Sequence, residues 1–470
     1  MRILYGLAAV CAAALLLSAC GGGDDADKAA SSEDAFDRNP YPSTYAPYPN
    51  APVLITNATI LDGEGNLIED GSLLLQDGKI VALGADIEAP DGAETIDATG
   101  RWVTPGIIDN HSHLGVYPSP GVTAHGDGNE ISAPVTAEVW SEHGVWPQDP
   151  GFTRAIAGGI TSLQVLPGSA NLFGGRGVIL KNVPSRTVQG MKFPDAPYTL
   201  KMACGENPKR VYGYGGGRFP GGAPYSRMGN VAGYRQAWIK AAEYKRKWEK
   251  YEDEGGEPPA RDLELDTLAG VLNGDILVHM HCYRADEMAQ IMDMSKEFGY
   301  KVTAFHHAVE SYKIADKLAE YGAWSSMWAD WWGFKMEAYD GVRENIPMVH
   351  KAGACAIVHS DSDVGIQRLN QEAAKAWSDG LRAGIDIPKE VAWTWLSLNP
   401  AKSLGIDDRT GSLKPGKMAD VVVWSDDPFS VYAKADQVFI DGALMFDRDH
   451  PETNPVMDFE IGQPGEGDRK

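Results

Sequence analysis

The middle of the chain repeats one unit, a short apolar run followed by a helical pattern, and this repeat most constrains the fold. The apolar runs are Thr161–Leu166, Tyr198–Ala203, Ile276–His281, Val302–His307 and Ala354–His359. Apolar residues recur at the three- and four-residue spacing of an amphipathic helix in Ala285–Phe298, Tyr312–Tyr321 and Gln367–Ala383. Because polar residues recur at successive strand ends, the pattern predicts an α/β fold built on a (β/α)8 barrel of the TIM type rather than an open sheet.

Short runs bounded by Gly, Asp or Asn stand near both ends of the chain and predict a smaller β-domain. Four of them lie between Val53 and Leu83, and two more, Ala419–Trp424 and Gln437–Gly442, lie near the other end. We therefore expect a composite β-sandwich domain made of residues 51–104 and 406–460, with the barrel of residues 105–405 inserted between its two halves.

Two histidines end the buried strand-like stretch TPGIIDNHSH. His111 and His113 lie two residues apart, so on a strand they share one face, about 6.5–7 Å apart, and can bind one ion. This spacing alone is weak evidence, but His281 and His307 end later strands and Asp361 follows the last apolar run. Since the carboxyl ends of barrel strands meet on one face, the five side chains predict a histidine-rich site for Zn²⁺ or a similar divalent ion.

Six motifs carry a resemblance to a known family. They are Thr104–His113, Leu166–Asn171, His281–Asp286, His307–Glu310, Ser360–Ser362 and Gly411–Asp420. With these motifs the chain resembles the amidohydrolase superfamily, and within it the imidazolonepropionase-like and prolidase-like amidohydrolases, from Val53 to about Asp447. The resemblance implies a metal-dependent hydrolase barrel with a small β-sandwich domain.

The resemblance also implies a role for each candidate ligand. His111 and His113 become the first-strand ligands, and His281 and His307 become the ligands of the fifth and sixth strands. Asp361 becomes the eighth-strand ligand and the catalytic proton carrier.

Lys201 falls where binuclear members of the superfamily place a lysine that carbon dioxide has carboxylated and that bridges two ions. The alternative is an ordinary lysine of the barrel wall, although burying a lysine without a partner in an apolar strand is costly. The implied cofactor is therefore one or two divalent metal ions, with Zn²⁺ favoured.

The resemblance further implies that a metal-activated water hydrolyses a C–N bond in an amide, a cyclic amide or a dipeptide, with Asp361 taking the proton. Deaminases of the superfamily usually carry a glutamate three residues after the fifth-strand histidine, and here that residue is Arg284. Deamination is thereby disfavoured, and Tyr283 and Arg284 become candidates to bind the substrate, with packing at the barrel rim as the alternative. The competing function is a non-catalytic binding lipoprotein that retains the barrel, and metal analysis would separate the two.

Several other histidines, tryptophans and charged residues are expected to have structural roles. His279 is expected in the core or behind a ligand, and His306 is expected to point away from His307 because side chains alternate on a strand. Four tryptophans within Trp324–Trp332 either line a pocket or pack in the core. The charged segment Tyr234–Glu257 predicts a solvated helix and loop outside the barrel.

The N-terminus has the pattern of an exported lipoprotein. In residues 1–20 one basic residue, Arg2, precedes an apolar run too short to span a bilayer, and the segment ends in a lipobox-like LSAC whose Cys20 would carry lipid. Residues 21–50 are rich in Gly, Asp, Ser, Ala and Pro and predict a flexible linker. We expect a periplasmic or cell-envelope protein that meets the membrane only through its anchor at Cys20.

The net charge limits the partners that the protein can bind. A formal net charge of −23 argues against nucleic acid and leaves a small molecule or short peptide as the substrate, with a homo-oligomer left open.

Cys11 would leave with the signal peptide and Cys20 would carry lipid, so Cys204, Cys282 and Cys355 remain. An odd, widely spaced set predicts no structural disulfide.

Overall fold

The computed structural model describes residues 39–119, 121–214 and 222–454. The predicted signal peptide with Cys20 lies outside the described residues, as do most of the predicted linker and the end of the predicted 406–460 segment. Within the described ranges, no helix has both the length and the apolar composition that crossing a bilayer requires.

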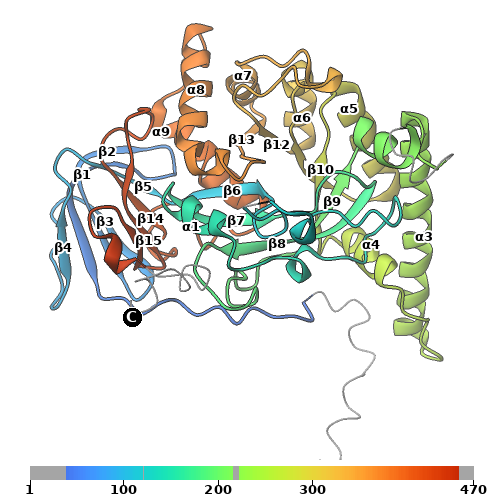
Figure 1. Ribbon diagram of the computed structural model, residues 1–470, viewed down its shortest axis with the longest axis horizontal. Helices are drawn as coiled ribbons and strands as arrows, with labels where there is room; N and C mark the ends of the chain where they lie inside the picture. The colour runs from blue at the N-terminus through green and yellow to red at the C-terminus, as the bar shows by residue number, and fades with distance from the viewer. Residues whose placement is uncertain (1–38, 120, 215–221, 455–470) are drawn as a thin grey trace, which may run out of the picture.

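Eight strands form the central sheet, which curves into a barrel (Figure 1). Their order across the sheet is β6 (Ile107–Ser112), β7 (Ile160–Val165), β8 (Phe173–Lys181), β9 (Thr199–Ala203), β10 (Leu277–His281), β11 (Val302–His306), β12 (Trp324–Met327) and β13 (Cys355–Val358). The backbone N–H of Asp361, just after β13, donates to the carbonyl of His111 at 3.1 Å. The first and last strands therefore meet at their carboxyl ends, and the predicted barrel is confirmed.

One strand departs from the predicted parallel arrangement. β8 pairs antiparallel with both β7 and β9, whereas the other neighbouring strands of the barrel are parallel. Its sequence, FGGRGVILK, is rich in glycine, which is disfavoured in strands. Packing requires glycine here, because a Cβ on Gly177 would lie 2.5 Å from Oγ1 of Thr199 and Gly175 has a φ of 112°.

Helices follow most of the barrel strands and lie on the outside of the barrel (Figure 1), but no helix of the described residues separates β7, β8 and β9, and α8, α9 and α10 all follow β13. They are α1 (Pro150–Ile156), α2 (Glu206–Pro208), α3 (Arg227–Glu254), α4 (Leu263–Asn273), α5 (Ala285–Phe298), α6 (Ala315–Tyr321), α7 (Asn345–Lys351), α8 (Leu369–Arg382), α9 (Lys389–Ala392) and α10 (Leu398–Ser403). The predicted helix Ala285–Phe298 is confirmed as α5. The long helix α3 is not wholly solvated as predicted, because Tyr234, Trp238 and Trp248 recur at helical spacing and are buried on one face.

The two ends of the chain meet in a second eight-stranded sheet. Its strands are β1 (Val53–Leu61), β2 (Leu67–Gln76), β3 (Lys79–Gly84), β4 (Glu94–Asp97), β5 (Trp102–Pro105), β14 (Val421–Trp424), β15 (Ala435–Ile440) and β16 (Ala443–Asp447). β5 joins the two ends because it pairs with β1 on one side and β14 on the other, and both ends contribute to one buried apolar cluster. β5 is separated from β6 only by Gly106, so this sheet fixes the start of the first barrel strand. The domain boundaries assigned from the sequence stay a prediction.

Residues 39–50 lie along the folded body, as the blue segment beneath the barrel in Figure 1. Oγ of Ser43 donates to the carbonyl of Lys192 and the hydroxyl of Tyr48 donates to the carbonyl of Pro184, both at 2.6 Å. These contacts place residues 39–50 against the barrel, while the flexible linker over residues 21–50 stays a prediction. Composition missed the hydrogen bonds that their serine and tyrosine side chains make with the barrel.

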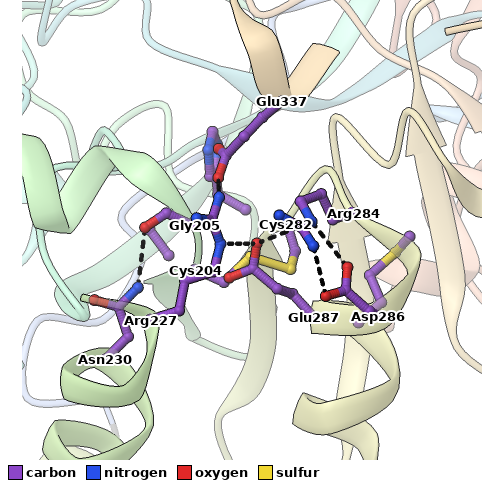
Figure 2. The surroundings of a disulfide bond; sticks show 12 residues. Cys204, Gly205, Arg227, Asn230, Cys282, Arg284, Asp286, Glu287 and Glu337 are labelled. Atoms are coloured by element: carbon purple, nitrogen blue, oxygen red, sulfur yellow. Dashed lines mark hydrogen bonds and ion pairs between the residues drawn. A yellow bond between two sulfur atoms is a disulfide. The ribbon is translucent and has the colours of Figure 1, made fainter. Parts of the chain in front are cut away.

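Cys204 and Cys282 form a disulfide bond, so the prediction of no structural disulfide is wrong (Figure 2). β9 and β10 are parallel neighbours in which Ala203 lies opposite His281, and the two cysteines are the next residues of each strand. The sheet therefore brings them together although they are 78 residues apart in the sequence. Cys355 is a free thiol.

Candidate metal centre

Asp109 fixes the end of β6, where the two motif histidines lie. Its Oδ1 accepts the backbone N–H groups of His111 and Ser360, each at 3.2 Å, and Oγ of Ser360 donates to its Oδ2. Asp109 is fully buried, and burial raises its pKa to about 7 despite these hydrogen bonds. The strand that presents His111 is thus tied to the loop that carries Asp361.

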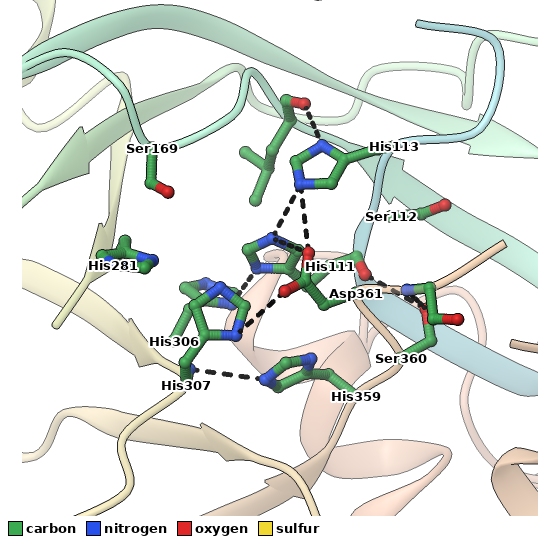
Figure 3. A network of polar contacts seen from close by, with 12 residues as sticks. His111, Ser112, His113, Ser169, His281, His306, His307, His359, Ser360 and Asp361 are labelled. Atoms are coloured by element: carbon green, nitrogen blue, oxygen red, sulfur yellow. Dashed lines mark hydrogen bonds and ion pairs between the residues drawn. The ribbon is translucent and has the colours of Figure 1, made fainter. Parts of the chain in front are cut away.

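His111 lies at the centre of a polar cluster (Figure 3). Its Nε2 lies 3.3 Å from Nε2 of His113 and 3.4 Å from Oδ1 of Asp361, and those two atoms are 3.2 Å apart. Nδ1 of His111 lies 2.9 Å from Nδ1 of His306, and Nδ1 of His113 lies 2.8 Å from the carbonyl of Leu166. Three candidate ligand atoms therefore face one point, and a partner behind each ring orients the imidazoles.

The three other predicted metal-site residues surround this group. Nδ1 of His307 lies 3.6 Å from Oδ2 of Asp361, and Nζ of Lys201 lies 3.4 Å from Nε2 of His111. The ring of His281 lies 4.9 Å from the ring of His307, measured between centroids. All six residues that the sequence singled out for the metal site are thus brought together.

Three further histidines take places behind or beside this cluster. His359 forms, with His111 and His307, a second group whose candidate ligand atoms lie within 4.8 Å of one another. His306 was expected to point away from the site but lies against His111, and its Nε2 is 2.8 Å from Nδ1 of His279 in the core. The expectation fails because β11 ends at His306 and His307 has a left-handed φ of 54°, so strand alternation stops there.

Burial keeps the cluster in the protonation state that binds cations. Burial, and then the charge of Lys201, lower the pKa of His111 well below its ordinary value. Burial likewise lowers the pKa of His281 and of His307. Burial alone would raise the pKa of Asp361, but His307 and the other facing histidines hold it below its usual range. Neutral imidazoles beside an ionised carboxylate are the forms that bind divalent metals.

The hydrogen-bonding pattern fits a bound divalent cation. Among the described residues, Nδ1 atoms of His281, His307 and His359 are buried without a hydrogen-bond partner. Buried polar atoms are nearly always partnered, so a bound cation accounts for ring nitrogens left unpartnered in a cluster that also holds the Asp361 carboxylate. Imidazole nitrogens and one carboxylate are a donor set suited to Zn²⁺.

A cavity of about 460 Å³ opens above the cluster. Tyr283, predicted to bind substrate, lines it, with its ring 4.8 Å from the ring of His281. Arg284 is not brought to this cavity but lines a neighbouring one of about 610 Å³. The reason is Asp286 in the first turn of α5, whose carboxylate binds the Arg284 guanidinium at 2.9 and 2.8 Å.

Residues outside the barrel strands, which the sequence did not single out, complete the cavity wall. Lys335 donates to Oδ1 of Asn207 at 3.0 Å, and Nδ2 of Asn207 lies 3.3 Å from Nε2 of His281. Trp328 stacks on His307 with ring centroids 4.5 Å apart, so the tryptophan-rich stretch contributes to the site. The one sequence signal for Lys335 is its place in the loop that follows a barrel strand at the catalytic end.

Comparison with known proteins agrees with this geometry. The model of the amidohydrolase family matches residues 102–445. Amidohydrolase tasK of Hapsidospora irregularis is 35% identical over 384 residues, which are 77% of this chain but only 38% of that protein. Imidazolonepropionase of Mesorhizobium japonicum is 23% identical over 73% of this chain and 84% of its own length. The crystal structure of an amidohydrolase from Thermotoga maritima MSB8 has a TM-score of 0.77 at 36% identity, covering 84% of this chain and 100% of that one. The chain therefore belongs to the amidohydrolase family.

Proposed function

We propose that this protein is an exported metal-dependent hydrolase that cleaves a C–N bond in an amide, a cyclic amide or a dipeptide. The observation that carries the proposal is the meeting of His111 Nε2, His113 Nε2 and Asp361 Oδ1 within 3.2–3.4 Å of one another beside a cavity. Membership of the amidohydrolase family supports the same chemistry. Zn²⁺ is the favoured ion because imidazole nitrogens dominate the ligand set.

The protein's part in this reaction is to fix the ligands and to move one proton. A divalent ion supplies Lewis-acid chemistry, polarising a carbonyl and lowering the pKa of water from 15.7 toward about 7. The Asp361 carboxylate lines the cavity, so it can accept the proton of the attacking water and pass it to the leaving nitrogen. His306 and the carbonyl of Leu166 hold the rings of His111 and His113 in place.

Lys201 supports a two-ion form of the site. Burial lowers its pKa to about 7, so its uncharged amine is present at neutral pH. The uncharged amine adds to carbon dioxide, forming an N–C bond and releasing one proton to solvent. Because Nζ lies 3.4 Å from Nε2 of His111, the resulting carbamate oxygens would lie among the ligands.

The experiment that tests the proposal combines metal analysis with a substrate screen. We expect the purified protein to hold one or two equivalents of divalent ion and to release amine from dipeptides, N-acyl amino acids or cyclic amides. Chelation should abolish the release and Zn²⁺ should restore it, while Asp361→Asn should lower the rate by about 10²–10⁴-fold. A protein that binds no divalent ion under native conditions would instead be the non-catalytic binding lipoprotein.

The proposal places the protein in the periplasm or cell envelope, with a lipid anchor on Cys20 as its only attachment to the membrane. The Cys204–Cys282 disulfide supports export, since such bonds persist in oxidising compartments. A lipid on Cys20 would be found by mass spectrometry of the N-terminal peptide, and an unmodified or uncleaved N-terminus would contradict it.

A further inference from the structure

The cavity above the histidines carries positive charge beyond the proposed metal site. The chain as a whole has a net charge of −23, so its average surface repels anions. Among the charged residues that line the cavity, Lys201 and Asp361 belong to the ligand set. Those that remain are Arg210, Lys335 and Glu206, two cations against one anion. A divalent ion would make the cavity more positive still.

Lys335 is turned into this cavity. Its side chain is only 17% exposed, whereas its neighbours Phe334 and Met336 are 59% and 80% exposed. Its Nζ lies 4.1 Å from the centroid of the Tyr283 ring. Burying an ammonium group is costly, and burial accordingly lowers the pKa of Lys335. A loop that exposes two apolar side chains while directing a lysine inward indicates a use for the charge.

Asn207 connects Lys335 to the candidate metal centre. Its Oδ1 accepts from Nζ of Lys335 at 3.0 Å, while its Nδ2 donates to Oγ of Ser169 at 2.8 Å and lies 3.3 Å from Nε2 of His281. An ammonium group has three donors. Asn207 takes one, and Glu206 forms an ion pair with Nζ at 3.7 Å, beyond hydrogen-bond distance, so at least one donor remains for a ligand in the cavity.

The segments that carry Asn207 and Lys335 are fixed by contacts of neighbouring residues, among them Cys204, Gly205 and Glu337 (Figure 2). The disulfide between Cys204 and Cys282 anchors the segment that leads to Asn207. Glu337, two residues after Lys335, packs against Gly205, where a Cβ would lie 2.7 Å from its carboxylate. Arg227 of α3 forms ion pairs with Glu337 and, at 2.9 Å, with Glu287 of α5. The ammonium group is thus preorganised by the fold.

We propose that Lys335 is a specificity-determining residue that binds a carboxylate on the substrate while the scissile carbonyl lies at the histidine cluster. This inference rests on the proposed function and deepens it. It assigns the substrate to amides that carry a free carboxylate near the scissile bond, in the manner of an N-acyl amino acid. Phe334, exposed at the same cavity, offers an apolar surface to the rest of such a molecule.

The test compares the binding of two probes that contain no C–N bond. They are the ketomethylene isostere of N-acetyl-leucine, in which CH₂ replaces NH, as the free acid and as the methyl ester, titrated calorimetrically into the zinc-loaded protein. The wild type should bind the acid at least about 10-fold more tightly than the ester. Lys335→Met should weaken binding of the acid alone by about 10- to 100-fold, and Lys335→Arg should retain most of the preference.

Lys209→Met is the matched control, because Lys209 lines only the neighbouring cavity of about 610 Å³ and should leave the preference unchanged. Unchanged ester binding in Lys335→Met shows that the variant is folded. Equal affinities for acid and ester in the wild type, or a preference that survives in Lys335→Met, would overturn the inference. Amine release from amides separates the two proposals: hydrolysis without a carboxylate preference refutes only the role of Lys335, and a Lys335-dependent preference without any hydrolysis refutes only the proposed function.

Discussion

Lys201 is the residue that sets the number of ions in the proposed centre. If its carbamate bridges two ions, Lys201→Ala should remove one of them and halve the metal content measured by inductively coupled plasma mass spectrometry. Lys335→Met is the control, since Lys335 lines the same cavity but lies outside the ligand set, and it should keep the full content. Unchanged stoichiometry in Lys201→Ala would contradict the two-ion form and indicate a mononuclear, imidazolonepropionase-like arrangement.

The sequence could predict the positions of those site residues that lie on or next to regular strands. Alternation along a strand predicted that His111 and His113 share a face, and although His113 lies just after β6 the two Nε2 atoms are 3.3 Å apart. His306 was predicted wrongly because the chain leaves the strand at His307, a change of φ that no composition signals. Lys335 lies in a loop and Asn207 in the three-residue helix α2, and neither segment is long enough in a regular period to relate a residue to the site it faces.

The strand β8 and the Cys204–Cys282 disulfide were not predicted from the sequence. The strand β8 was missed because its glycines, among them Gly177 that packs closely against Thr199, resemble a loop. The disulfide was missed because the number and spacing of cysteines in the sequence do not show which strands are neighbours in the sheet. Cys204 and Cys282 each directly follow a predicted strand, and placing those strands side by side would have paired them.

The disulfide gives the proposed export a direct test. We expect alkylation of the denatured, unreduced protein from the cell envelope to label Cys355 alone, because Cys204 and Cys282 are bonded to each other. Reduction before alkylation should add labels on those two cysteines. Peptide mass spectrometry reads each site separately, and Cys355 serves as the internal control for complete labelling. Labels on Cys204 and Cys282 without reduction would contradict an oxidised pair in that compartment.

Across the molecule, most strands of both sheets could be predicted from the sequence, but the contacts that join the two sheets could not. Lys181 on the barrel strand β8 is buried and forms ion pairs with Asp420 at 2.7 Å and Asp441 at 3.1 Å. Both aspartates come from the C-terminal stretch of the chain that contributes to the other sheet. Tyr45 of the N-terminal segment donates to the same Asp441. Three stretches remote in sequence meet around one ammonium group, and neither hydrophobic periodicity nor turn composition reports such a contact.

Lys181→Met should therefore destabilise the junction by about 3–5 kcal/mol, because it leaves Asp420 and Asp441 buried without a counter-charge. Replacing both carboxylates as well, in Lys181→Met/Asp420→Asn/Asp441→Asn, should recover most of the loss, whereas the exposed Lys247→Met should cost little. Urea unfolding monitored by tryptophan fluorescence measures each variant, and a triple variant no more stable than Lys181→Met would contradict the charge argument.

The difference in unfolding free energy between the wild type and Lys181→Met should depend on pH in one direction. Burial alone would lower the pKa of Lys181, but Asp420 and Asp441 raise it above its ordinary value. A raised folded-state pKa means that the stabilisation is fully present below the unfolded lysine pKa of about 10.4 and is lost as the pH rises through the folded value. The gap in unfolding free energy between wild type and Lys181→Met should thus stay constant from pH 7 to about 10 and narrow above it. A gap that stayed unchanged above pH 10, through the whole range in which lysine titrates, would contradict the Lys181 ammonium as the source of the stabilisation.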